Sequence, residues 1–293
     1  MLSMKRTLSQ LVTIARFSML EHLGTPVILL LTLTASVGTL VLPFFQFQRF
    51  SEDGRLARDC GLATCFLFGL FIAIGCAAKL RRTLTDGTAA IAFTKPLARG
   101  TWLCGQIGGA ILVLLWFLLT MGAAVLTAEG CSPQYHSTGA YADVRGLLLS
   151  LLFPCGALFV GALNHRFRRG RFTLTASFAF PILLWCTLFI PQQLHWGSLS
   201  ALIPIALFLI QGIGLTSALA IYLPTGMCCC ITLACTFLSL CFCYGSAYLP
   251  LDLLAYGGHV PIKLILLLVP QALTALLLFS WIGIQLLCHK ESL

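Results

Sequence analysis

The sequence predicts an all-α integral membrane protein with about eight transmembrane helices and both termini on the cytoplasmic side. Its composition, its long uncharged windows and the distribution of its basic residues lead to this prediction. Only 9% of the 293 residues are charged, against about a quarter in soluble domains, and 59% are hydrophobic. This composition excludes a soluble enzyme, a disordered chain and a nucleic-acid-binding domain, despite the net charge of +9.

Long windows without Asp, Glu, Lys or Arg define the membrane spans, because a helix crosses the hydrocarbon core in about 20 residues. The longest window, 172–251, is divided at 191–197 and at 222–226 by helix-breaking residues. The second of these breaks carries no charge, so six spans plus a re-entrant hairpin is the alternative to eight. The eight predicted spans lie near 26–47, 60–78, 101–128, 146–163, 172–190, 198–221, 226–248 and 264–288.

The basic residues give the orientation, since Lys and Arg are more frequent in cytoplasmic connections. With the N-terminus in the cytoplasm, the inner segments hold 13 basic and three acidic residues, whereas the outer segments hold five and six. The net positive charge is therefore explained by topology. The expected location is the inner membrane of a bacterium, in a multi-pass arrangement.

The segment 1–22 precedes the first span and has apolar residues at helical spacing, among them Leu8, Leu11, Val12 and Ala15. This pattern predicts an amphipathic helix that lies in the inner membrane interface. The first apolar run begins too late and is too long for a cleaved signal peptide. Residues 23–293 are expected to form a single transmembrane domain.

Motifs for catalysis and cofactor binding are missing from the sequence. No lysine follows a glycine, which excludes a phosphate-binding loop, and neither the His-Glu-x-x-His nor the Gly-x-Ser-x-Gly motif occurs. Most of the 14 cysteines fall inside predicted spans, where packing is favoured over a soft-metal path as their role. We therefore expect no catalytic residue, cofactor or metal site in this chain.

The connection 79–100 is longer than an ordinary turn. Asp86-Gly87-Thr88 predicts a break, Ile91 and Phe93 belong to a short apolar helix, and Lys95-Pro96 predicts its end. Such a helix beneath the membrane is either a passive anchor or the element that a cytoplasmic motor grips.

Several short motifs resemble one family. They are Asp59 at the start of the second span, Asp86-Gly87-Thr88, Lys95-Pro96-Leu97-Ala98-Arg99 and Gly105-Gln106-Ile107-Gly108. Together they resemble the permease subunits of ABC exporters of the second type, whose ATPase is a separate chain. Residues 14–21 are similar to the connecting helix of that family. Gln106 departs from the pattern, because the family usually has Lys there.

The resemblance implies that 86–93 is a coupling helix seated in a groove of the ATPase. The residues that it implies for ATPase coupling are Asp86, Gly87, Thr88, Ile91, Phe93, Lys95, Pro96 and Arg99. It also implies a cytoplasmic ATP-binding-cassette ATPase and a second permease copy or paralogue as partners, in contact with membrane lipid. ATP is then bound by the partner and not by this chain, and the function is movement of an unidentified substrate across the inner membrane.

Two other functions remain open on the sequence alone. One is a non-catalytic structural or assembly subunit of a membrane complex. The other is a membrane-embedded enzyme acting on a lipid-linked substrate, with polar groups drawn from the outer segments. Those groups are Glu129, His136, Asp143, Gln192, Gln193 and His195.

Overall fold

The computed structural model describes the chain in eight ranges. These ranges are 2–45, 54–89, 98–132, 134–136, 139–141, 143–191, 194–242 and 262–290. All statements below concern these residues.

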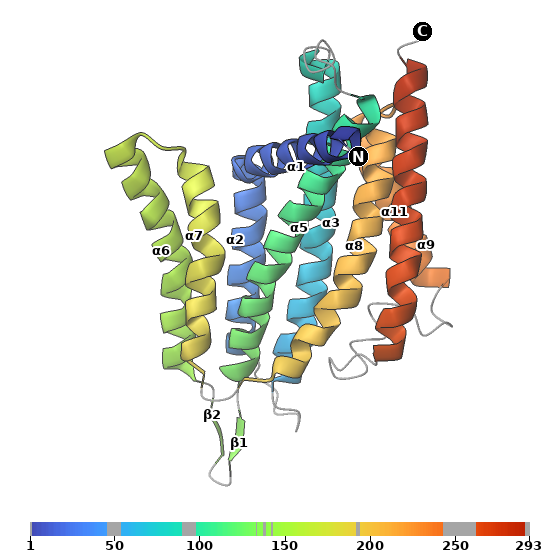
Figure 1. Ribbon diagram of the computed structural model, residues 1–293. Coiled ribbons are helices and arrows are strands. Elements are labelled where there is room, and N and C mark those ends of the chain that lie inside the picture. Colours follow the sequence, from blue (N-terminus) through green and yellow to red (C-terminus); the bar gives the residue numbers. More distant parts are fainter. Residues whose placement is uncertain are drawn as a thin grey trace.

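The protein is a bundle of long helices, as predicted (Figure 1). Seven helical segments in the described residues are long and apolar enough to cross a membrane. The long helices are α1 (Leu2–Leu23), α2 (Pro26–Val41), α3 (Arg55–Thr85), α5 (Arg99–Gly130), α6 (Val144–Arg168), α7 (Phe172–Cys186), α8 (Leu202–Ala220), α9 (Thr225–Phe242) and α11 (Ile262–Lys290). The short 3-10 helices are η1 (Leu42–Phe45), η2 (Thr187–Phe189) and η3 (Trp196–Ala201).

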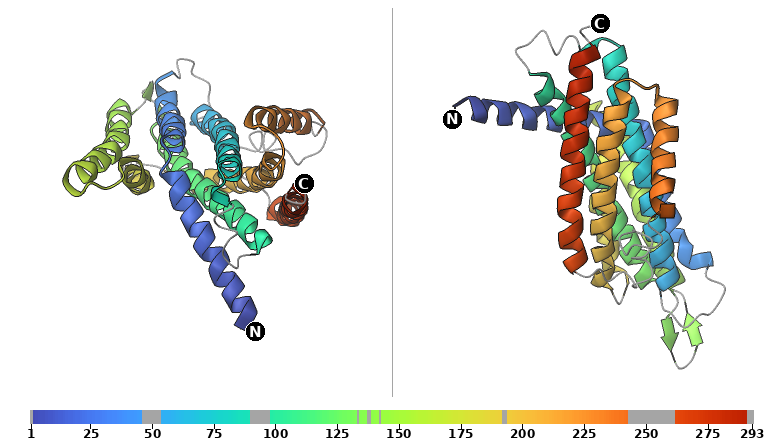
Figure 2. Two further views of the ribbon diagram at one scale, coloured as in Figure 1. Left: turned by 90° about the horizontal axis from the view of Figure 1, so that it is seen from above. Right: turned by 90° about the vertical axis from the view of Figure 1, so that its right-hand side faces the viewer.

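Helix α1 runs across the bundle, whereas the other long helices run along it (Figures 1 and 2). Its direction changes at Gly24 and Thr25, where α1 ends and Pro26 begins α2. Proline suits the first position of a helix because its fixed φ fits and no amide hydrogen is needed there. A helix over residues 2–23 agrees with the predicted amphipathic segment, and its position in the membrane interface stays a prediction.

The two ends of the bundle differ. Both chain termini lie at one end, which we call the terminal end (Figure 1). The opposite end carries a short antiparallel hairpin and is called the hairpin end. The hairpin consists of β1 (Gln134–His136) and β2 (Gly139–Tyr141), with Tyr135 opposite Ala140. This small hairpin is an addition to the all-α fold that was predicted.

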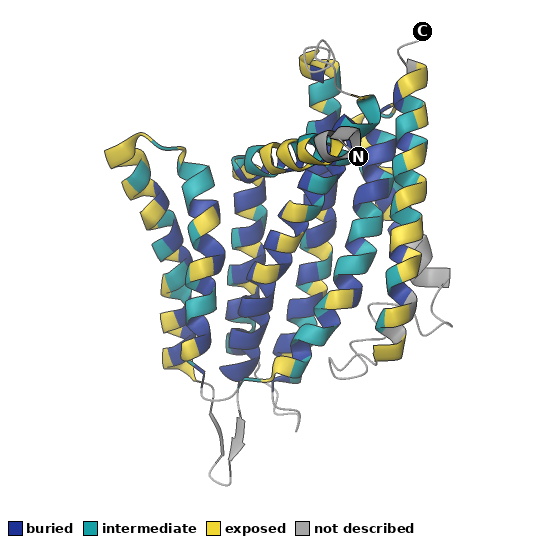
Figure 3. Ribbon diagram, viewed as in Figure 1, coloured by how far each residue is buried: buried dark blue, intermediate teal, exposed yellow. Residues whose placement is uncertain are grey.

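Helix α5 forms the centre of the bundle. In its membrane window 78% of the residues are buried, against 17% for α11 and 33% for α6. Helices α1, α2, α3 and α8 pack around it, while α6 and α7 form an antiparallel helix pair at one edge (Figures 2 and 3). Exposed leucines and phenylalanines cover the outward faces of the peripheral helices, as expected for surfaces that contact lipid.

The span count differs from the predicted eight. Seven segments qualify in the described residues, and in α9 only the shorter apolar stretch Thr225–Thr236 was found. However, α9 starts at the terminal end and α11 starts near the hairpin end (Figures 1 and 2), so the chain passes between the two ends from 225 to 262. Residues 243–261 of this passage lie outside the described ranges. Helix α8 qualifies over 25 residues with η3, which favours a full crossing over a re-entrant hairpin.

Candidate functional site

The connection between α3 and α5 at the terminal end contains the predicted coupling residues. Helix α3 ends at Thr85, and Asp86 is its C-cap, with its amide donating to the Arg82 carbonyl at 2.8 Å. Gly87 adopts a φ of +72°, a conformation that glycine takes without steric cost. The Thr88 hydroxyl donates back to the Thr83 carbonyl at 3.0 Å. The predicted break is therefore confirmed as a closed turn.

This turn faces outward. Asp86, Gly87 and Thr88 are all exposed, while Ala89 is buried in the main apolar core. Four of the predicted coupling residues, Ile91, Phe93, Lys95 and Pro96, lie outside the described residues. Arg99 is described and is the first residue of α5. The structure thus places the start and the end of the predicted coupling segment at the terminal end.

The last two turns of α3 are connected to two other helices by basic side chains. Arg81 donates from one guanidinium nitrogen to the carbonyls of Ala220 and Ile221, at 3.3 and 2.7 Å, where α8 ends. A cation at a helix C-terminus satisfies carbonyls that lack a partner within the helix. Lys79 forms an ion pair with Glu21 of α1 at 3.3 Å. Asp86 is therefore separated by two turns of helix or less from the contacts that α3 makes with α1 and α8.

Helix α1 packs closely on the first turns of α5, at a stretch that contains Gly105, Gly108 and Gly109. A Cβ atom built on Gly109 would lie 2.5 Å from the Cβ of Ser18 and 2.9 Å from the Ala15 carbonyl oxygen. Ser18 donates a hydrogen bond of 2.8 Å to the side chain of Gln106. The residue that departs from the family pattern thus holds α1 against α5.

The elbow between α1 and α2 is fixed by α7. The hydroxyls of Thr173 and Ser177 donate to the carbonyls of Gly24 and Leu23, at 2.7 and 3.0 Å. His22 is buried beside them, and its Nδ1 has no hydrogen-bond partner among the described residues. Burial, with a smaller contribution from the Lys79 charge, lowers the pKa of His22 to about 3, so the imidazole is neutral at physiological pH.

A buried charge cluster lies at the hairpin end, and the sequence prediction missed it. Glu129, which was assigned to an outer loop, lies in the last turn of α5 with its side chain only 3% exposed. Its carboxylate is 3.7 Å from the Arg58 guanidinium of α3 and accepts a 2.6 Å hydrogen bond from Ser198 of η3. Arg58 also contacts Asp59 at 3.1 Å. The sequence held one signal for this cluster, because charges of opposite sign border neighbouring spans at the same end of the bundle.

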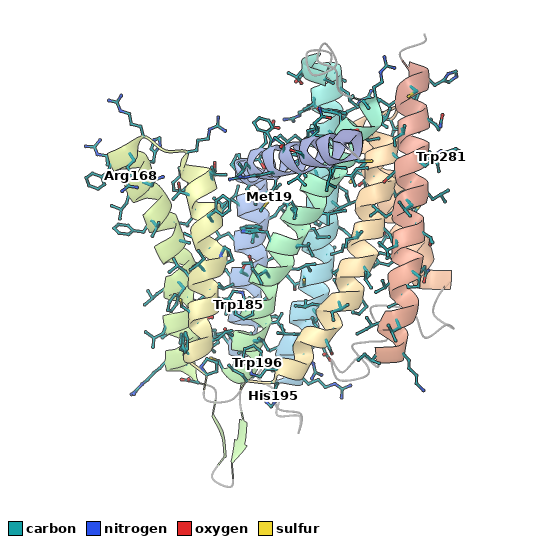
Figure 4. The ribbon with its side chains drawn as sticks, in the orientation of Figure 1. Met19, Arg168, Trp185, His195, Trp196 and Trp281 are labelled. Carbon is teal, nitrogen blue, oxygen red and sulfur yellow. The ribbon has the colours of Figure 1, made fainter. Side chains whose placement is uncertain are left out.

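We call these four residues the Glu129 cluster (Glu129, Arg58, Asp59 and Ser198). Gly54 packs directly against it. Its φ is +73°, and a Cβ there would lie 2.9 Å from both the Cγ and the carbonyl oxygen of Glu129. A side chain at position 54 would therefore push against the buried carboxylate. His195 and Trp196 lie at the same end, opposite Met19 and Arg168 (Figure 4).

Of the other polar groups of the outer segments, His195 lies close enough for its charge to act on the Glu129 carboxylate. Asp143 is the N-cap of α6 and accepts from the Gly146 amide at 2.9 Å. His136 belongs to β1, and Gln192 and Gln193 lie outside the described residues. Within the described ranges, no group of three His, Cys, Asp or Glu residues could hold a metal ion.

Comparisons with known proteins return nothing: no protein-family model, no curated protein and no solved structure matches the chain.

Proposed function

We propose that this protein is the permease subunit of an ABC transporter of the second exporter type, driven by a separate ATPase that binds at the terminal end. The observation that carries the proposal is the attachment of the exposed Asp86–Thr88 turn to three helices. Arg81 connects it to α8, Lys79 connects it to α1, and the chain itself leads into the central helix α5. A partner that moves this turn thereby moves the bundle.

The chemistry of energy use lies in the partner. Binding and hydrolysis of ATP change the affinity of the ATPase for two positions of the turn, and that difference biases the bundle between two conformations. The permease supplies contact surface and stiffness rather than catalytic groups. A second permease copy or a paralogue completes the transporter in the bacterial inner membrane, with lipid around the exposed apolar faces.

Purification from native membranes in mild detergent tests the proposal. The expected result is a soluble ATPase with a phosphate-binding loop, in stoichiometric amount with the permease. Deletion of 86–93 is expected to abolish its copurification. The matched control shortens the hairpin 134–141 at the opposite end, and it should retain the ATPase.

Two results would contradict the proposal. One is an intact, monodisperse wild-type protein without any ATPase, which would favour the structural-subunit alternative if other membrane proteins accompany it. The other is an ATPase that remains bound and stimulated after the deletion of 86–93. Monodispersity of each variant in gel filtration separates a lost contact from a lost fold.

A further inference from the structure

The turn between α6 and α7 presents a dense positive charge at the terminal end. His165, Arg166, Arg168, Arg169 and Arg171 fall within seven residues that contain no acid. These five side chains are exposed, and Arg168 points away from the bundle (Figure 4). Among the described residues, none of the four guanidinium groups takes part in an ion pair.

The backbone of this turn is held in a fixed shape by side chains. Asn164 donates to the Thr175 hydroxyl at 2.6 Å, and that hydroxyl contacts the Arg171 carbonyl at 3.2 Å. A ring nitrogen of His165 lies 3.0 Å from the Gly170 carbonyl oxygen. These contacts close the turn across its base, so the arginines project from a fixed base and not from a loose loop.

Arg169 occupies a position where glycine or asparagine would be expected. It is the C-cap of α6, with φ 52° and ψ 24°, and it is the only residue other than glycine with positive φ in the described chain. Left-handed backbone costs energy for a residue with a Cβ. A strained arginine at an exposed helix end indicates that its charge is useful there.

The surroundings are apolar on one side and electropositive on the other. Phe167 is 79% exposed, and Phe159 lies two turns earlier on α6 with its side chain also exposed. Helix α7 begins at Phe172 without a side-chain cap. Uncapped amides at a helix N-terminus favour an anion. A phosphate above the turn and acyl chains along the face of α6 would satisfy both features at once.

From this juxtaposition we propose that the 165–171 turn is a binding site for the headgroup of an anionic phospholipid in the adjacent leaflet. The arginines contact the phosphate and glycerol region, and the phenylalanine face of α6 packs on the acyl chains. A soluble protein fits less well, because the turn lies at the edge of the bundle, apart from the α3–α5 connection, and is flanked by lipid-facing residues (Figures 1 and 2). The site is independent of the proposed transport function.

Lipid retention measured by native mass spectrometry tests the proposal. Protein in neutral detergent is offered phosphatidylglycerol or phosphatidylcholine with the same acyl chains. Each arginine near a charged membrane surface contributes about fivefold in affinity, from about 1 kcal/mol. We expect selective retention of phosphatidylglycerol, with about fivefold weaker binding in Arg168→Gln. Arg145→Gln is the matched control, since Arg145 is exposed at the other end of the same helix.

Arg169→Gly separates a lipid role from a structural one. Glycine accepts the left-handed conformation, so this variant should melt no lower than the wild type while it binds phosphatidylglycerol more weakly. Lower stability with unchanged lipid binding would overturn the proposal. Equal retention of the two lipids, or equal loss in Arg145→Gln, would overturn it as well. Displacement of the lipid by millimolar inorganic phosphate would assign the turn to a small anion instead.

Discussion

Replacement of Gly109 by alanine tests whether α1 is held on α5 by a close backbone approach. The new Cβ would lie 2.5 Å from the Ser18 Cβ and 2.6 Å from its hydroxyl oxygen, both well inside van der Waals contact. Because the third neighbour is the Ala15 carbonyl at 2.9 Å, α1 cannot relieve the contact by rotating one side chain. Helix α1 must shift away from α5, and the Ser18–Gln106 hydrogen bond is strained or lost with it.

Gly108→Ala is the matched control. Its Cβ would meet only the Ala15 Cβ, at 3.5 Å, which is an ordinary contact. Both substitutions gain the same helix propensity, up to about 1 kcal/mol. The difference between the two variants therefore isolates the packing cost, which is about 1–3 kcal/mol for overpacking a tight contact.

The assay is thermal unfolding of the two variants in the same detergent, at equal protein concentration. Gly108→Ala should melt at or above the wild-type temperature, and Gly109→Ala clearly below it. If the two variants melt at the same temperature, α1 is not packed on α5 as described. This contact would then give no support for a stiff connection between α1 and the bundle.

Three further predictions concern polar side chains at contacts between helices. Glu129→Ala should lower stability by about 3 kcal/mol, because it leaves Arg58 buried with Asp59 as its one ion-pair partner among the described residues. Replacing both Arg58 and Glu129 by methionine should recover most of the loss in a double-mutant cycle. Arg81→Ala should lower the stability measured in melting assays by about 1–3 kcal/mol, because the carbonyls at the end of α8 lose their donor. The variant should still bind the ATPase but stimulate its activity less. His22 stays neutral in the folded protein down to about pH 3, whereas in the unfolded chain it takes up a proton below about pH 6.5. Its contribution to stability should therefore be constant above pH 6.5 and fall towards pH 3. The melting temperature of His22→Gln should depend less on pH over this range than that of the wild type.

The sequence was sufficient for the helices but not for their exact ends. Uncharged windows locate the crossings because the membrane requires about 20 apolar residues. The start of α3 was predicted at 60 and lies at Arg55, because charged residues were taken as loop. Arg58 and Asp59 instead continue the helix, because Arg58 pairs with both Asp59 and Glu129, and Arg55 pairs with Asp59 as well. The linear pattern shows which charges border neighbouring spans, but not which of them form ion pairs.

The candidate site shows the same division. The break at Asp86-Gly87-Thr88 is local, and it was predicted correctly because glycine with positive φ and a helix C-cap belong to one turn. That α3 continues to this break, beyond the span end predicted at 78, was not predicted. Gly105 and Gly109 allow a close helix approach, but nothing local in the sequence identifies the partner, which is α1. The carbonyls that Arg81 contacts lie about 140 residues away in the sequence. Backbone acceptors of this kind have no residue signature.

The two ends of the bundle are joined in different ways, and this difference predicts how the bundle moves. At the hairpin end, the Glu129 cluster joins α3, α5 and η3 through buried charges whose separation would be costly. At the terminal end, α3 is joined to α1 by a partly exposed ion pair, which contributes little stability, and to the end of α8 by the hydrogen bonds of Arg81. A force on the Asp86–Thr88 turn should therefore tilt α3 about the hairpin end. A spin label near Lys79 on α3 and a second label on α1 should change their distance when nucleotide is added. Labels near Glu129 should keep their distance. An equal or larger change near Glu129 would show that the cluster is not the pivot.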